Sequence, residues 1–109
     1  MTDEELYLRL VEKYALCVLE DAGCGKGTYL AHCTRGDPVF ENLYALSRYT
    51  QRLPQAIKDA HSEVEWGHVK VIQYALDQPL GFDHEWLWNV VQQDVPRIKG
   101  AAMAALAEL

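Results

Sequence analysis

Apolar residues recur at intervals of three and four along most of this chain, which is the spacing of an amphipathic helix. In the first segment the apolar stripe consists of Tyr7, Val11, Tyr14 and Val18. Charged residues fall on the opposite side of the same helical wheel, as in a helix that packs one face on a core. Thr2 and Glu5 form a capping box ahead of the stripe. The pattern predicts a helix from residue 3 to about residue 22.

A short helical turn and a second main helix are predicted next along the chain. Residues 28–34 have the length of a short extra helical turn and are followed by Gly36. Asp37 then has the position of an N-cap and Pro38 that of the first helical residue, where its missing N–H costs nothing. The next stripe extends to Pro54, so we expect a second main helix from Pro38 to about residue 53.

The third and fourth main helices are predicted from longer stripes. The third runs from Pro54 to about Asp77, and its stripe consists of Ile57, His61, Val64, His68, Val71 and Ala75. The fourth follows an N-cap at Asp83, and its stripe consists of Leu87, Val91, Val95, Ile98, Ala102, Ala105 and Leu109. Pro96 is expected to kink or restart this last helix, since proline inside a helix removes a hydrogen bond. The fold class is therefore all-α: a compact bundle of four main helices plus one short extra helical turn, in a single domain of residues 1–109.

Composition limits the functions that fit such a domain. The 109 residues are 50% hydrophobic and 24% charged, with a formal net charge of −6. A negative chain lacks the cations needed for nonspecific nucleic-acid binding, and its charge favours a basic partner. The acidic N-terminus has no leader-like character, no apolar run is long enough for a membrane, and the cysteine count is odd. We therefore expect a cytoplasmic protein.

The stretch Gly23-Cys-Gly-Lys-Gly-Thr resembles part of a phosphate-binding loop, but the loop's first glycine would stand at position 20, where the chain has Glu20. Such a loop also follows a buried strand, whereas a helix is predicted here. We therefore expect Gly23 to end the first helix in the left-handed conformation that glycine tolerates. Binding of a nucleotide or another small ligand between helices stays open as a further alternative.

A His/Glu cluster suggests metal chemistry. His61, Glu65 and His68 would lie along one side of the third helix, at spacings found among transition-metal ligands in helical bundles. The alternative is that the two histidines lie at the core edge and each bonds to a neighbour such as Glu65. A zinc site made of Cys17, Cys24, His32 and Cys33 is a weaker candidate, because structural zinc ligands usually come in closer pairs.

Three aromatic residues point to a binding surface. Trp66 falls almost opposite the apolar stripe of the third helix, Trp86 lies off the stripe of the fourth, and Tyr49 stands beside Arg48. Tryptophan and tyrosine are favoured interface anchors. The alternative for Trp66 is that another helix covers it.

These observations favour a small acidic protein-interaction module without chemistry of its own. A stoichiometric inhibitor or neutraliser of another protein, of the kind represented by phage-encoded inhibitors and immunity proteins, fits by analogy of type. The rival hypothesis is a metal-binding helical bundle that uses His61, Glu65 and His68. The four-three spacing from Ile57 to Ala75 would also suit a seam between two copies, so homodimerisation stays open, as does the reactivity of the thiols.

Overall fold

The computed structural model describes residues 2–78 and 81–109, and in these ranges the chain forms six helices and no strand. The helices are α1 (Asp3–Ala22), α2 (Lys26–His32), α3 (Pro38–Gln51), α4 (Gln55–Ala60), α5 (Trp66–Leu76) and α6 (His84–Ala107). The all-α prediction is confirmed. None of these helices is both long enough and apolar enough to cross a bilayer.

Side-chain caps begin three of the helices where the sequence predicts them. The Thr2 hydroxyl accepts the backbone N–H of Glu5 at 3.1 Å. Asp37 accepts from Val39 at the start of α3, and Asp83 accepts from Trp86 at the start of α6, both at 3.0 Å. Each bond satisfies an N–H that has no partner inside the helix.

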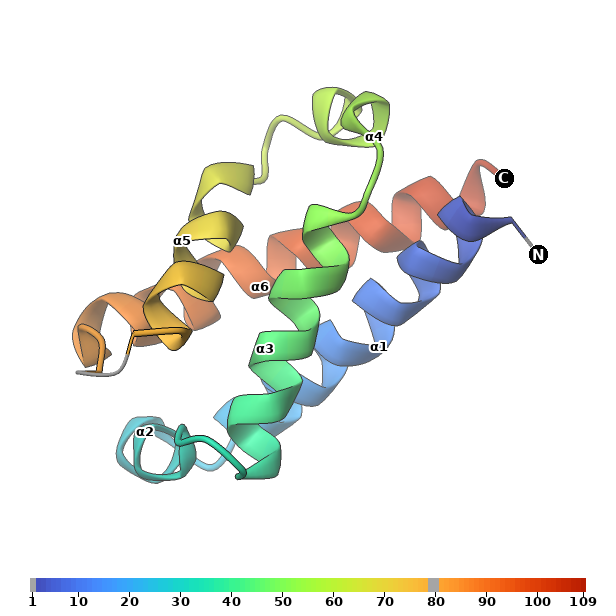
Figure 1. The fold of residues 1–109 in the computed structure, drawn as a ribbon. Coiled ribbons are helices and arrows are strands. Elements are labelled where there is room, and N and C mark those ends of the chain that lie inside the picture. The colour runs from blue at the N-terminus through green and yellow to red at the C-terminus, as the bar shows by residue number, and fades with distance from the viewer. Residues whose placement is uncertain (1, 79–80) are drawn as a thin grey trace.

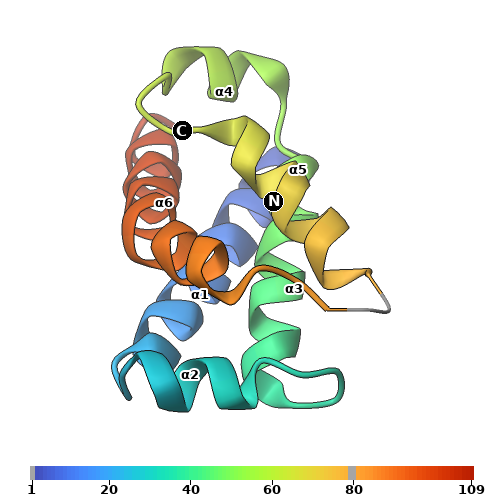
Figure 2. The ribbon, with the colours of Figure 1, turned by 90° about the vertical axis from the view of Figure 1, so that its left-hand side faces the viewer.

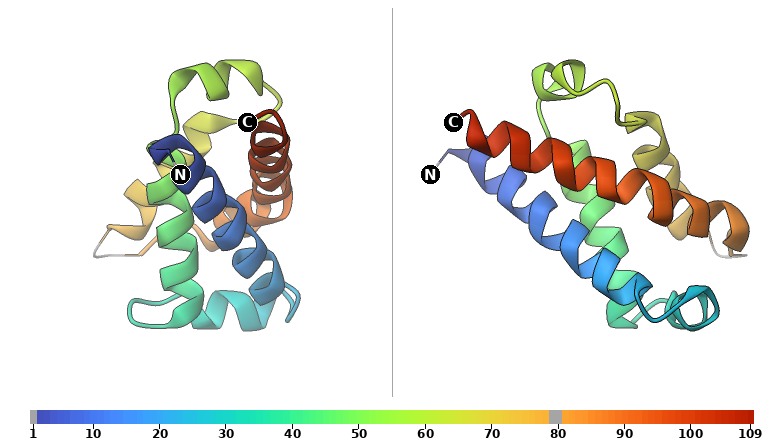
Figure 3. Two further views of the ribbon diagram at one scale, coloured as in Figure 1. Left: turned by 90° about the vertical axis from the view of Figure 1, so that its right-hand side faces the viewer. Right: turned by 180° about the vertical axis from the view of Figure 1, so that it is seen from behind.

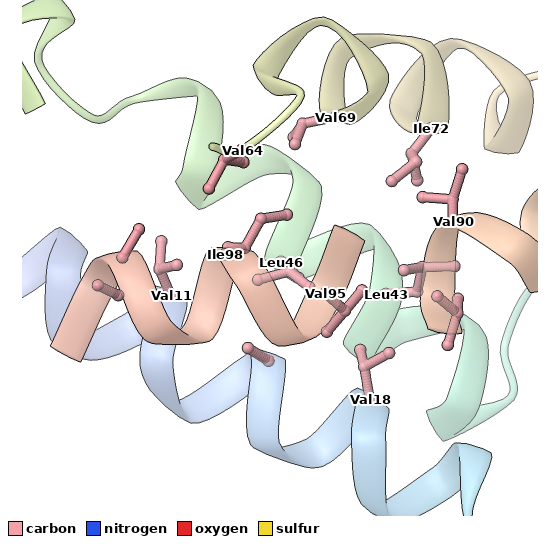
Figure 4. Packing of buried hydrophobic residues seen from close by; sticks show 14 of the residues in the cluster. Val11, Val18, Leu43, Leu46, Val64, Val69, Ile72, Val90, Val95 and Ile98 are labelled. Carbon is pink, nitrogen blue, oxygen red and sulfur yellow. The ribbon is translucent and has the colours of Figure 1, made fainter. Parts of the chain in front are cut away.

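The two longest helices, α1 and α6, lie side by side and run in opposite directions, so that the chain termini meet at one end of the molecule (Figures 1 and 3). Helix α3 packs on α1, and α5 packs on α3 and α6. Helix α2 lies across the end opposite the termini, and α4 lies beyond the other end of α3 (Figure 2). Core side chains, among them Ile72 of α5 and Val90 of α6, lie between these two helices (Figure 4).

The core is mainly aliphatic and receives residues from each of the four longer helices (Figure 4). Its centre is formed by Val11 and Val18 of α1, Leu43 and Leu46 of α3, Val69 and Ile72 of α5, and Val95 and Ile98 of α6. Burial of each such side chain stabilises the fold by roughly 1.5–3 kcal/mol before entropy is subtracted.

The single helix predicted from Pro54 to Asp77 is wrong, because residues 61–65 separate α4 from α5. The physical reason is that a continuous helix and a broken helix bury different residues. A continuous helix would turn His61 and His68 toward the core. The break instead changes the helical phase, so that α5 buries Val69, Ile72 and Leu76 and leaves Val71 47% exposed.

Helix α6 continues through Pro96 as one element, so the predicted restart does not occur. Pro96 removes the hydrogen bond to the carbonyl of Gln92, one turn earlier. Both residues are exposed, and water can therefore solvate that carbonyl. This explains why the helix tolerates a proline in its middle.

Candidate functional site

The residues singled out in the sequence occupy three separate places. Trp66 lies at the break between α4 and α5, where its indole N–H donates to the backbone carbonyls of Lys58 and His61 at 3.1 and 3.0 Å. His68 and Trp86 meet in a pocket between α5 and α6. Tyr49 belongs to an aromatic cluster on α1 and α3.

The pocket between α5 and α6 is built on a pair formed by His68 and Asp94. His68 Nδ1 lies 2.7 Å from Asp94 Oδ2, and the Asp94 side chain is only 6% exposed whereas that of His68 is 44% exposed. An ionised carboxylate can only accept a hydrogen bond, so Nδ1 carries the proton and donates. In the neutral ring, Nε2 then keeps a lone pair on the side away from Asp94.

Trp86 forms the wall of this pocket. Its ring meets the His68 ring edge to face, with centroids 6.2 Å apart and planes inclined by 77°. The pocket has a volume of about 190 Å³, and its lining is completed by Asn89, Val90 and Gln93. Among the described residues no hydroxyl, thiol or amine lines the pocket, which presents the Asp94 carboxylate, the His68 ring, two side-chain amides and an aromatic surface.

The predicted His61, Glu65 and His68 cluster does not form. The segment that contains His61 and Glu65 is not helical, so the three residues do not share one helix face. His61 pairs with Glu63 at 3.2 Å and His68 pairs with Asp94. In the described part of the chain, no group of three or more His, Cys, Asp or Glu side chains is arranged to hold a metal ion.

The predicted zinc site of three cysteines and His32 does not form among the described residues either. Cys24 is exposed, Cys17 is half-buried and Cys33 is buried, and His32 is paired with Asp37 at 2.9 Å. Burial, and secondarily the Asp37 carboxylate, raises the pKa of the Cys33 thiol to about 11. Asp37 itself has a lowered pKa, chiefly because it accepts the Val39 N–H and then because of His32.

The glycine loop connects α1 to α2 and differs from the prediction in one detail. Gly23 has right-handed angles (φ −61°, ψ −18°), and the left-handed residue is Gly25 with φ +96°. Lys26, the lysine of the motif, binds both carboxylate oxygens of Glu85 at the start of α6, at 2.5 and 2.6 Å. This exposed ion pair therefore joins the start of α2 to the start of α6.

The aromatic cluster around Tyr49 brings together three tyrosines from two helices. Tyr49 of α3 stacks on Tyr14 with centroids 5.8 Å apart and contacts Tyr7 at 6.1 Å. All three rings are half-buried against the core. Arg52 lies 5.8 Å from the Tyr7 ring and donates to its hydroxyl at 3.3 Å.

Basic side chains border these rings. Lys13 lies 5.2 Å from the centroid of Tyr14, and Arg48 and Glu41 both line a hollow of about 120 Å³ beside Tyr49. Over residues 2–78 and 81–109, the recorded ion pairs include none formed by Lys13, Arg48 or Arg52. We call this set, Tyr7, Tyr14, Tyr49, Lys13, Arg48 and Arg52, the tyrosine surface.

Sequence reasoning missed Asp94, Tyr7 and Tyr14 as site residues. Asp94 falls on the buried face of α6, between Val91 and Ile98, and a carboxylate at such a position could have indicated a polar contact inside the fold. Tyr7 and Tyr14 belong to the stripe of α1, and the sequence does not show that they lie at its edge, next to α3.

No family model, curated protein or solved structure matches this chain.

Proposed function

We propose that this protein is an interaction module that binds another protein through the tyrosine surface. The observation that supports the proposal is the stacking of Tyr49 on Tyr14, and its contact with Tyr7, beside arginines that form no ion pair within residues 2–78 and 81–109. Tyrosine and arginine are enriched in the residues that dominate protein interfaces, whereas lysine and glutamate are depleted.

The tyrosine surface is held in place before any partner binds. Each ring is half-buried against the core, and the Tyr7 hydroxyl accepts from Arg52. A side chain that is already immobilised loses little rotamer freedom on binding, so more of its contact energy appears as affinity. This supports a binding role for Tyr49, which the sequence predicts.

Charge indicates the chemistry of the contacting segment. Lys13, Arg48 and Arg52 favour carboxylates on the partner at the point of contact, because like charges across an interface are destabilising. The net charge of −6 acts at longer range, where it favours a basic partner and opposes a nucleic acid. The partner that fits is a neutral or basic protein with one acidic segment, because the segment pairs with the basic side chains at the contact and the rest of the partner is attracted by the net negative charge.

Within this function, the finer expectations from the sequence remain proposals. The protein acts as a stoichiometric inhibitor or neutraliser in the cytoplasm. Homodimerisation is the alternative. Trp66 and Trp86 stay candidate contact residues, and a bend of α6 at Pro96 stays a prediction.

A peptide library displayed on phage and selected against the immobilised full chain tests the proposal. We expect enrichment of acidic peptides, and replacement of Tyr49 by Ala or of Arg48 by Glu to weaken their binding at least about tenfold, the loss of one interface anchor. Tyr74→Ala is the matched control, since Tyr74 is a tyrosine on α5 that is 68% exposed. Circular dichroism checks that each variant is folded. Enrichment of basic peptides, no enrichment, or equal loss in the Tyr74 variant would contradict the proposal.

A further inference from the structure

The pocket between α5 and α6 contains a carboxylate that is removed from water but not fully hydrogen-bonded. Asp94 is 4% exposed, and its Oδ2 atom accepts from His68 at 2.7 Å. In residues 2–78 and 81–109 no donor to Oδ1 is recorded. In these ranges, the side-chain oxygens that lack both a hydrogen-bond partner and contact with solvent are Tyr29 Oη and Thr50 Oγ1. Oδ1 is not one of them, so it retains some contact with solvent. Asp94 is one of the residues that line the pocket, so a ligand bound there lies next to this carboxyl group.

Three other polar side chains of the pocket can also accept hydrogen bonds. With its Nδ1 proton donated to Asp94, a neutral His68 ring presents the lone pair of Nε2. Asn89 and Gln93, one turn apart on α6, each carry an amide whose oxygen accepts and whose NH2 group donates. No lysine or arginine lines the pocket among the described residues, so the negative charge of Asp94 has no fixed cation there apart from a protonated His68.

Trp86 adds an aromatic surface to this set of acceptors. The face of an indole attracts cations, and a planar guanidinium can stack on it while its N–H groups point outward in the ring plane. An ammonium ion is a compact, strongly hydrated charge and makes less use of a flat wall. The volume of about 190 Å³ suits one side chain or a small molecule and excludes a folded element.

From these observations we infer that the pocket formed by His68, Trp86, Asn89, Val90, Gln93 and Asp94 binds a guanidinium group. The group donates to Asp94 Oδ1 and to the amide oxygens, and it lies against Trp86. The site is separate from the tyrosine surface, and the inference does not depend on the proposed function. Its ligand is either the arginine side chain of a partner protein or a free guanidinium compound.

Nuclear magnetic resonance of the full ¹⁵N-labelled chain tests the inference, because the Trp86 indole N–H reports directly from the pocket. The probe is N-acetyl-arginine amide, and the matched probe is N-acetyl-citrulline amide, which has nearly the same shape but no charge. We expect a saturable shift of the Trp86 resonance with the arginine probe, at a Kd of the order of 1 mM, and at least about tenfold weaker binding of the citrulline probe.

Variants of equal charge provide the second readout. Asp94→Asn keeps the size of the side chain and an oxygen for the His68 N–H, and we expect it to weaken the arginine probe at least about tenfold. Glu20→Gln, an exposed site on α1, makes the same change in net charge and should bind like the parent. If Asp94→Asn does not fold, Trp86→Phe replaces it, with a smaller expected loss. Comparison with free agmatine separates the sources, since tighter binding of the capped arginine indicates a partner's side chain. The inference is overturned by no saturable shift, by equal binding of the citrulline probe, or by equal loss in both charge variants.

Discussion

The indole N–H of Trp66 donates to the backbone carbonyl oxygen of His61, five residues earlier in the chain, at 3.0 Å. The same N–H lies 3.1 Å from the carbonyl of Lys58. The last carbonyls of a helix have no partner within it. Trp66, the first residue of α5, therefore caps the end of α4 and fixes the turn between the two helices.

Replacement of Trp66 should lower stability, in proportion to what is removed. We expect Trp66→Phe to cost about 1 kcal/mol of unfolding free energy through the lost hydrogen bonds. Trp66→Ala should cost about 3 kcal/mol, because it also removes a ring that packs on the core. Urea denaturation followed by circular dichroism measures both changes. An unchanged unfolding midpoint for Trp66→Ala, together with lost partner binding, would instead identify Trp66 as an interface anchor.

The caps of the helices can be predicted from the sequence, whereas the turn that Trp66 caps cannot. The caps at Thr2, Asp37 and Asp83 are local, and their positions are predicted correctly because the bond joins residues two or three apart. The break after α4 sets the phase at which α5 packs on α3 and α6, and this tertiary packing cannot be deduced from local spacing. A regular four-three spacing continues through the break, so periodicity alone predicts one helix.

The glycine loop allows a matched test of backbone conformation. Gly25 has φ +96°, which strains any other residue, whereas Gly27 lies inside α2 with open space around it. We expect Gly25→Ala to destabilise the protein by roughly 1–3 kcal/mol and Gly27→Ala to stabilise it by up to about 1 kcal/mol. Thermal unfolding of the two variants gives opposite shifts in Tm. Shifts of the same sign would show that the loop does not hold Gly25 in this conformation.

The contact between His68 and Asp94 should contribute to stability as well as to the pocket. Because His68 is 44% exposed, water can replace part of its bond to Asp94, and we expect His68→Ala to cost about 1–2 kcal/mol. A double-mutant cycle with Asp94→Ala isolates the interaction, with an expected coupling of about 1 kcal/mol. Additive effects of the two changes would mean that the side chains do not interact in solution.

The sequence predicts individual members of this site but not their assembly. His68 stands out as a polar residue within an apolar stripe, and Trp86 stands out because it lies off the stripe of its helix. The sequence assigns them to different functions, metal binding for His68 and partner binding for Trp86. Their meeting depends on the phase of α5, which the break after α4 determines. Asp94 completes the site, and it is separated from His68 by 26 positions in the chain.

The thiols should differ in reactivity because only Cys24 is exposed and Cys33 is buried. The thiolate is the reacting form, and burial raises the pKa of Cys33 to about 11. We expect Ellman's reagent at pH 8 to modify Cys24 rapidly and Cys33 only after unfolding, with peptide mapping by mass spectrometry to identify each product. Rapid modification of Cys33 in the folded protein would contradict its burial.

The raised pKa of Cys33 also predicts a loss of stability in alkali. An exposed thiol titrates near 9.0, so between pH 9.0 and about 11 the unfolded chain releases a proton that the folded chain retains. The unfolded state then binds fewer protons, and the free energy of unfolding falls as pH rises, by up to about 2 kcal/mol. Tyr29, whose pKa is raised chiefly by burial, acts in the same direction. Cys33→Ala removes the thiol contribution and should flatten the dependence measured by urea unfolding from pH 8 to 11. An equal slope in the parent and the variant would assign the whole effect to Tyr29 and other groups.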